Sequence, residues 1–211
     1  MLLTLVRHGE TDWNRQRRIQ GSTDVPLNDT GRDQARASAA ILARRSWDAV
    51  YTSPLVRASE TAAIIADHLG LGVPTPVAAL VERSYGASEG FTDTELAKRY
   101  PEGVDVPGRE AREAVLARAL PALQNLGLVH PSGAVIVVSH GGLIRSVLAA
   151  VDPAGRHGMI TNGSIHTFAV DEGSLRLIAF NDPLDELSEA LGDDIVDQNP
   201  LERREMEGGR A

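Results

Sequence analysis

The sequence contains no cysteine and no long apolar run, and each absence narrows the class of protein. Without cysteine the chain has no disulfide bonds, no thiolate metal ligands and no cysteine nucleophile. No apolar stretch approaches the roughly 20 residues that a membrane-spanning helix needs. The start of the chain lacks the charged region and cleavage site of a signal peptide. We therefore expect a cytoplasmic protein with no membrane segment.

An excess of positive charge is also lacking, and the negative charge is concentrated at one end of the chain. The 211 residues have a net charge of -8, of which residues 182–211 carry -7 because they contain ten Asp or Glu residues against three Arg. The rest of the chain is almost neutral and would not repel an anionic ligand, whereas an acidic extension is unsuited to nucleic acid. We predict an acidic C-terminal extension over 182–211 and no nucleic-acid partner.

Strand-like and helix-like patterns alternate along residues 1–181. Apolar runs at residues 2–6 and 134–138 are typical of strands that are buried on both faces. Amphipathic stretches at residues 29–44 and 55–69 are typical of helices. This alternation favours an α/β fold, a three-layer sandwich in which a mostly parallel central sheet has helices on both faces. With 42% hydrophobic residues, the region is long enough for one domain with a buried core.

Two predicted helices carry more specific local signals. Ser53 and Pro54 are residue types preferred at the N-cap and at the first position of a helix, so they predict where the second helix begins, and Gly70 predicts where it ends. Residues 108–126 also have a helical pattern, but Pro121 lies inside it. A proline there should kink the helix or begin a second one.

Two of the predicted strands end in a histidine followed by glycine. His8 and Gly9 follow the first strand. His140, Gly141 and Gly142 follow the strand near residue 138. Ligands bind at the carboxyl ends of the strands in open α/β sheets, and glycine lets the backbone turn away without a side chain in the way. We therefore expect the two histidines to converge on one site.

Two arginines predict that the ligand of this site is an anion. Arg7 directly precedes His8, and Arg57 falls in the first turn of the helix that follows Ser53. Free backbone N–H groups and the helix dipole favour negative charge at that end of a helix. The guanidinium fork matches phosphate oxygens with paired hydrogen bonds. The sequence therefore predicts a strongly cationic site for a phosphate group.

A histidine among phosphate-binding arginines can act as a nucleophile toward a bound phosphate group. A neutral ring nitrogen can attack phosphorus and form a phosphohistidine, which divides one difficult displacement into two easier steps. The departing alkoxide needs a proton donor, and Glu82 is the best candidate because it follows a predicted strand at residues 77–80. Burial should raise its pKa toward the working pH. Glu89 and Asp93 lie close by in the sequence and remain alternative carboxylates.

Four separated motifs contain the residues singled out above. They are Leu5 to Thr11 with Asn14, Ser53 to Leu55 with Arg57 and Ala58, Glu82 with Tyr85 and Gly86, and Ser139 to Gly142. Together and in this order they resemble the histidine phosphatase superfamily, the group of phosphoglycerate mutases and their phosphatase relatives. The resemblance covers residues 2–181, and four motifs are far more specific than an Arg-His-Gly sequence alone.

The resemblance implies a role for each motif residue. It implies that His8 is the phosphorylated nucleophile and Glu82 the proton donor, in a reaction without metal or cofactor. Arginines, helix ends and a protonated His140 would balance the charge that Mg²⁺ balances in other phosphoryl-transfer enzymes. Around the phosphoryl group the family places Arg7, Arg57 and His140, with Gly9, Asn14, Gln20, Gly21 and Gly141 nearby and Thr11, Arg83 and Tyr85 at the mouth of the substrate pocket.

The segment after Tyr85 bears on which activity of the family to expect. Residues 86–108, rich in glycine and proline, are predicted to form an excursion that caps the substrate site. Phosphoglycerate mutases of this type have a longer excursion, so the short one here, from Gly90 to Pro107, should admit water to the phosphohistidine. Hydrolysis is therefore favoured. Phosphoryl transfer of the mutase type is the alternative, and a protein that binds phosphorylated ligands without turnover is a third, less favoured one.

The expected partner is a small phosphorylated metabolite, either a sugar phosphate or a phosphoglycerate derivative. The excursion is too polar for a lipid or a large aromatic group. For assembly, the sequence leaves open a homodimer, the common case among soluble oligomers. Leu184, Leu187 and Leu191 stand at helical spacing in the acidic extension and could dock on the body or on a second subunit.

The remaining histidines match none of the motifs. They are His68, His130, His157 and His166, and none has the spacing of metal ligands with another histidine. We predict that all four are structural or exposed, and that the protein has no metal site.

Overall fold

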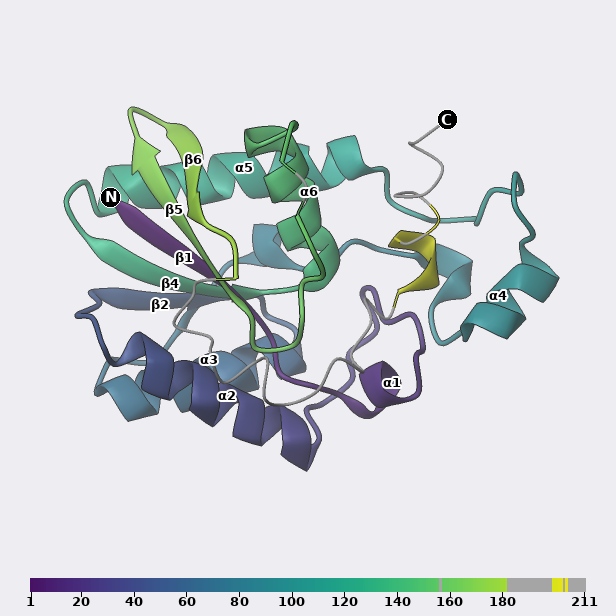
Figure 1. The fold of residues 1–211 in the computed structure, drawn as a ribbon, viewed down its shortest axis with the longest axis horizontal. Coiled ribbons are helices and arrows are strands. Elements are labelled where there is room, and N and C mark those ends of the chain that lie inside the picture. Colours follow the sequence, from purple (N-terminus) through teal and green to yellow (C-terminus); the bar gives the residue numbers. More distant parts are fainter. Residues whose placement is uncertain (156, 182–198, 203, 205–211) are drawn as a thin grey trace.

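A six-stranded mixed sheet lies at the centre of the computed structural model, which describes residues 1–155, 157–181, 199–202 and 204 (Figure 1). Its strands are β1 (Leu2–Arg7), β2 (Ala49–Thr52), β3 (Thr75–Pro76), β4 (Ala134–Ser139), β5 (Ile165–Asp171) and β6 (Ser174–Ala179), in the order β3-β2-β4-β1-β5-β6. The strands from β3 to β1 pair in parallel, and the β5–β6 hairpin adds antiparallel pairs at one edge. The predicted mostly parallel sheet is confirmed.

Helices cover both faces of this sheet (Figure 1). α2 (Asp29–Leu42) and α3 (Val56–Leu69) pack on one face, and α5 (Arg112–Val129) and α6 (Gly141–Val151) on the other. Alternate residues of β4 explain why: Val135 and Val137 enter the core with α5 and α6, whereas Ile136 and Val138 enter the core with α2 and α3. The predicted three-layer α/β sandwich is therefore confirmed.

Pro121 lies within α5, which runs on past it as one helix. Of the two outcomes predicted for Pro121, a kink or a second helix, the second helix does not form. Pro121 and Ala117, whose carbonyl loses its helical partner, are both exposed to water. Val115 and Leu123 on either side of the proline are fully buried against the sheet. This packing holds the parts of α5 before and after the proline against the same core.

Two local predictions near the site were wrong. Residues 77–80 do not form a strand: β3 ends at Pro76, and Ala78–Leu80 forms a 3₁₀ turn that places the buried Leu80 side chain in the core. Ser53 is not the N-cap of α3, since the helix begins at Val56 with Leu55 at the cap position. In both places a tertiary contact outweighed the local preference. The Leu80 side chain packs into the core, and the Ser53 hydroxyl pairs with His140.

The excursion after Tyr85 contains a 3₁₀ turn at Gly86–Ser88 and the short helix α4 (Asp93–Arg99). It encloses a small apolar cluster of Ile19, Tyr85, Leu96, Val106 and Leu201. Leu201 belongs to the C-terminal segment of residues 199–202, coloured yellow in Figure 1. The role of the excursion as a cap over the substrate stays a prediction.

The predicted extension over 182–211 lies mostly outside the described residues, including the three leucines at helical spacing. Within the described ranges, no helix combines the length and the apolarity that crossing a membrane requires.

Candidate active site

A cavity at the carboxyl ends of β1 and β4 collects most of the residues that the motifs predicted. Among those predicted residues, the ones that line it are Arg7, His8, Asn14, Gln20, Gly21, Arg57, Glu82, Tyr85 and Gly141. His140 lies directly behind this lining, with its ring centroid 5.1 Å from that of His8. Within the described ranges, no three histidine, aspartate or glutamate side chains group as ligands for a metal ion.

The parallel pairing of β1 with β4 brings the two histidines together. Arg7 stands opposite Ser139 in the register of these strands, so His8 and His140 follow at neighbouring positions. The His8 backbone N–H donates to the Ser139 carbonyl at 3.0 Å, which extends the pairing by one residue. Both side chains are buried. The expected convergence of the two histidines is confirmed.

The ring of His8 is held in one orientation with one tautomer. Its Nδ1 lies 2.7 Å from the Gly9 carbonyl, which can only accept a hydrogen bond, so Nδ1 carries the proton. Its Nε2 therefore carries no proton, and the electron pair of this nitrogen accepts the Nε–H of Arg57 at 3.2 Å. Burial and the charges of Arg57 and Arg7 hold the pKa of His8 well below its usual value. His8 is thus a neutral imidazole that is unprotonated at Nε2, and it lines the cavity.

Arg57 is fully buried and is held in place by the loop before α2. It donates to the Gly21 carbonyl at 2.7 Å and to the Thr23 carbonyl at 2.9 Å. Burial lowers the pKa of Arg57 to about 10, so the side chain stays cationic at neutral pH. These contacts explain how Gln20 and Gly21, far from the strands in sequence, reach the cavity.

Arg7 and the two predicted glycines beside the histidines have different surroundings. The Arg7 guanidinium donates to the Ile160 carbonyl at 2.5 Å. A Cβ on Gly141 would lie 3.4 Å from Arg7 Nε, in ordinary van der Waals contact with the guanidinium. A Cβ on Gly9 would lie 2.1 Å from the Gly31 carbonyl oxygen, so Gly9 is required for the close packing of α2.

The Glu82 carboxylate rests on the N-terminus of α6. It accepts the backbone N–H groups of Gly142 at 3.0 Å, Leu143 at 3.0 Å and Arg83 at 2.8 Å. Burial raises the pKa of Glu82 and outweighs the hydrogen bonds from Gly142 and Arg83 and the charge of Arg57, which lower it. A raised pKa makes this carboxyl group easier to protonate, as a proton donor requires.

The alternative carboxylates lie elsewhere. Glu89 accepts hydrogen bonds from Ser22 and Thr23 and so holds the loop that carries Gly21. Partial burial alone would raise the pKa of Glu89, but the hydrogen bonds of Thr23 and Ser22 bring it below its usual value. Asp93 is exposed in the first turn of α4. Glu82 is the only one of the three that lines the cavity.

His140 is held by Ser53 and is uncharged in this environment. Its Nε2 lies 2.7 Å from the Ser53 hydroxyl oxygen, and its buried Nδ1 has no hydrogen-bond partner among the described residues. Burial and the charges of Arg57, His8 and Arg7 place the pKa of His140 well below its usual value. The protonated His140 that the resemblance implied would therefore need a bound anion to offset this effect.

Thr11 and Arg83 do not line the cavity. The Thr11 hydroxyl accepts the Asn14 backbone N–H and caps α1 (Asp12–Arg15). Arg83 is buried and pairs at 2.9 Å with Glu202. Both residues thus lie behind the lining, where they hold neighbours that reach it.

The motifs missed several residues at the site. Arg18, Gly142, Asn199 and Glu202 line the cavity, and Asn162 donates to the His8 carbonyl at 3.0 Å. Gly142 stood in a motif and could have been named. Nothing in the sequence distinguishes Glu202 from the other acidic residues of the C-terminal extension.

The fold and the cavity define an α/β enzyme whose site combines buried histidines, arginines and one carboxyl group. The family model of the histidine phosphatase superfamily (branch 1) matches residues 3–183. The chain is 37% identical over 180 residues to "Uncharacterized phosphatase PhoE" of Bacillus subtilis (strain 168), which covers 84% of this chain and 92% of that protein. It belongs to the histidine phosphatase superfamily, as the four motifs indicated.

Two further relatives carry more specific names. The chain is 35% identical over 176 residues to the metal-independent phosphoserine phosphatase of Arabidopsis thaliana, with 78% of this chain and 74% of that protein covered. The solved structure of mycobacterial glucosyl-3-phosphoglycerate phosphatase in complex with VO3 matches with 30% identity and a TM-score of 0.76, over 85% of this chain and 98% of that one. The relatives are thus phosphatases of the phosphoglycerate mutase-like type.

Proposed function

We propose that the protein is a metal-independent phosphomonoester hydrolase that acts on a small phosphorylated metabolite through a phosphohistidine on His8. The observation that carries this proposal is the neutral His8 ring, unprotonated at Nε2, which lines one cavity together with Arg7 and Arg57. An unprotonated nucleophile beside cations that attract the phosphate is what attack on phosphorus requires.

In the first step, His8 Nε2 attacks the phosphorus atom and the bond to the ester oxygen breaks. Arg7 and Arg57 stabilise the charge on the phosphoryl oxygens, with the N-terminus of α6 nearby. The leaving alkoxide takes a proton from protonated Glu82, the form that burial favours. The products of this step are the free alcohol, a phosphohistidine and the Glu82 carboxylate.

In the second step, a water molecule attacks the phosphohistidine. The Glu82 carboxylate accepts a proton from this water, the N–P bond breaks, and its electron pair returns to His8 Nε2. Inorganic phosphate leaves and Glu82 is protonated again. One carboxyl group therefore serves as acid and then as base, as microscopic reversibility requires.

Hydrolysis is preferred over mutase-type transfer because of the short excursion and because the relatives described above are named phosphatases. A phosphoserine phosphatase and a glucosyl-3-phosphoglycerate phosphatase among them support a small phosphorylated metabolite as the substrate. Phosphoryl transfer between phosphoglycerate isomers remains the second candidate within the same chemistry.

The test is phosphate release by the purified full chain in the presence of a chelator. The substrates are sugar phosphates, phosphoglycerates, phosphoserine, nucleotides and an aryl phosphate. We expect release that persists with the chelator and falls by at least about 1000-fold in His8→Ala. His68→Ala is the matched control, since His68 is exposed on α3. If phosphoglycerate isomers interconverted without phosphate release, the mutase candidate would replace the hydrolase.

A further inference from the structure

The loop that carries Glu82 lies outside the strands and the α-helices, so its backbone carbonyl groups need other partners. Side chains supply them at four consecutive positions, from Ala79 to Glu82. The Ser139 hydroxyl at the end of β4 donates to the Leu80 carbonyl at 2.9 Å. The other three carbonyls accept hydrogen bonds from Arg118 on α5. Side chains from two distant elements thus hold the loop.

Arg118 uses every N–H group of its guanidinium in this region. Nη1 donates to the carbonyls of Ala79 at 2.7 Å and Val81 at 2.8 Å, and Nη2 donates to that of Glu82 at 3.1 Å. Nε donates to Glu110 Oε1 at 2.9 Å, and Nη2 donates to Glu110 Oε2 at 3.0 Å. A guanidinium is planar and its N–H groups point in fixed directions, so the carbonyls and the carboxylate are held at set positions relative to one another.

Glu110, just before α5, binds the same loop a second time. Its Oε2 accepts the Ser84 backbone N–H at 3.2 Å, and its own backbone N–H donates to the Ser84 carbonyl at 2.8 Å. Partial burial alone would raise the pKa of Glu110, but the hydrogen bonds and the charge of Arg118 bring it below its usual value. Glu110 is therefore a carboxylate at neutral pH, and its pair with Arg118 is ionic. The two side chains are only 22% and 21% exposed, so water screens the pair only in part.

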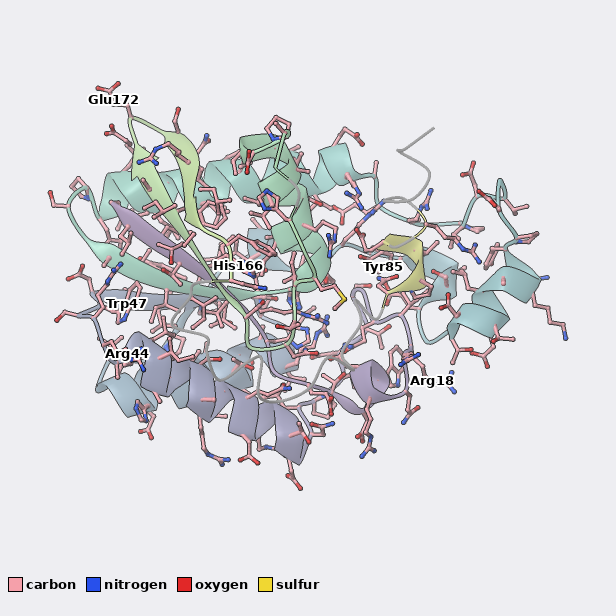
Figure 2. The ribbon with its side chains drawn as sticks, viewed as in Figure 1. Arg18, Arg44, Trp47, Tyr85, His166 and Glu172 are labelled. Atoms are coloured by element: carbon pink, nitrogen blue, oxygen red, sulfur yellow. The ribbon has the colours of Figure 1, made fainter. Side chains whose placement is uncertain are left out.

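Arg118 itself lies outside the cavity. It is not one of the described residues that line it, and it contacts the backbone of Glu82 rather than the carboxyl group. The Glu82 carboxyl group accepts the N–H groups of Gly142 and Leu143, so the residue is held at both ends. Tyr85, which follows the loop and is labelled in Figure 2, also lies next to the start of α6, where a Cβ on Gly142 would be 2.5 Å from its hydroxyl. Movement of the loop backbone would therefore move the carboxyl group relative to the cavity.

We propose that Arg118, held by Glu110, is a positioning residue for the proton donor: it fixes the backbone of residues 79–82 and so sets the distance between the Glu82 carboxyl group and the leaving oxygen of the substrate. The inference rests on the proposed phosphatase function, in which Glu82 gives its proton to the departing alkoxide. Proton transfer requires hydrogen-bond reach, and a misplacement of about 1 Å can cost about 100-fold in rate. Loss of Arg118 should therefore affect the step that needs the proton more than it affects the binding of phosphate.

The first test compares two substrates in Arg118→Met, which keeps a long side chain and removes all the N–H donors of the guanidinium. kcat/KM for an alkyl phosphate should fall by about 30-fold, because the alkoxide needs a well-placed proton donor, and for an activated aryl phosphate by less than about threefold. Arg36→Met is the matched control, since Arg36 pairs with Asp33 on the exposed side of α2. Losses that are equal for the two substrates, as a merely structural role would give, or absent from both would overturn the proposal.

Two further variants separate positioning from charge and from folding. Arg118→Lys keeps the positive charge, but a single ammonium group cannot span three carbonyls and a carboxylate. It should retain a loss of at least about tenfold for the alkyl phosphate. Wild-type kinetics in Arg118→Lys would mean that charge alone suffices, which would overturn the proposal.

In a Glu82→Gln chain, Arg118→Met should lower kcat/KM for the alkyl phosphate by less than about threefold more, because the group that Arg118 positions is already gone. A full additional loss of about 30-fold would show that Arg118 acts independently of Glu82, against the proposal.

A measurement without turnover uses the backbone N–H groups that contact Glu82. The amide signals of Gly142 and Leu143 in a nitrogen–proton NMR correlation spectrum report their hydrogen bonds to the carboxyl group, both at 3.0 Å. Both signals should shift in Arg118→Met and in Arg118→Lys, in the direction seen in Glu82→Gln, and should stay in place in Arg36→Met. Unchanged signals in the Arg118 variants would overturn the proposal. If the wild type released phosphate from no substrate, the proposed function would be wrong, and the amide signals would still decide whether Arg118 positions Glu82.

Discussion

The Glu82 carboxylate accepts the backbone N–H of Gly142 at 3.0 Å, which joins a loop carboxyl group to the first turn of a helix 60 residues further along the chain. The hydrogen bond favours the charged carboxylate, whereas burial favours the protonated acid. Burial has the larger effect and raises the pKa. A carboxyl group balanced in this way can both give and take a proton.

Replacement of Glu82 by glutamine should separate substrates by their leaving groups. Glu82→Gln should slow alkyl phosphate hydrolysis by at least about 100-fold, because an alkoxide needs a proton as it leaves, and an activated aryl phosphate by less than about tenfold. The measurement is kcat/KM for both substrates, with Glu102→Gln at an exposed position as the control. Equal losses for the two substrates would show that Glu82 is not the general acid.

The glycine at the start of α6 should be needed for activity. Gly142→Ala would place a Cβ 2.5 Å from the Tyr85 hydroxyl and 2.8 Å from Glu82 Oε1, so these groups must move. A displacement of this size at the proposed proton donor should lower kcat by about 100-fold. Gly72→Ala, where a Cβ meets nothing within 4 Å, should have no effect on kcat. Normal turnover by Gly142→Ala would contradict this close packing of Gly142 against Tyr85 and Glu82.

The hydrogen bond between Ser53 and His140 should contribute to stability and to turnover. Ser53→Ala leaves His140 Nε2 buried without its partner at 2.7 Å, so the free energy of unfolding should fall by about 1–3 kcal/mol. kcat should fall as well, because the ring is no longer held next to His8. Urea denaturation and steady-state kinetics measure the two effects. Ser59→Ala, on α3, is the control, and an identical response of both variants would exclude a specific role for Ser53.

The buried histidines should make the fold sensitive to mild acid. Burial lowers the pKa of His166 to about 3, so the unfolded chain takes up a proton near pH 6.5 that the folded chain refuses. Stability is therefore complete above that pH and is lost as the pH falls toward 3. Between pH 7 and pH 5 this histidine should reduce the free energy of unfolding by about 2 kcal/mol. His8 and His140 act in the same direction.

The variant that tests this sign is His166→Gln. This substitution removes the imidazole that takes up a proton when the chain unfolds. Denaturation midpoints should therefore depend less on pH between 7 and 5 than they do in the wild type. The exposed His68→Gln should keep the wild-type dependence. A pH dependence as steep in His166→Gln as in the wild type would mean that this histidine does not contribute.

Much of the fold and the main site residues followed from short sequence patterns. Short continuous apolar runs located β1 and β4, because a strand that is buried on both faces is apolar at successive positions. His8 and His140 could be placed together because each follows a parallel strand, and such strands end at one edge of the sheet. Gly70 was expected to end α3 and does so with a φ of 65°.

The sequence alone thus determined the layers of the fold and the family, and it predicted the histidines and arginines of the candidate site. Only the tertiary structure decided that Ser53 holds His140, that Glu82 rests on α6, and that Glu202 fills the space beside them. Each of these contacts joins residues far apart in the chain, so no local pattern encodes it. Burial, which shifts the pKa of His8 and Glu82, likewise exists only once the layers have packed.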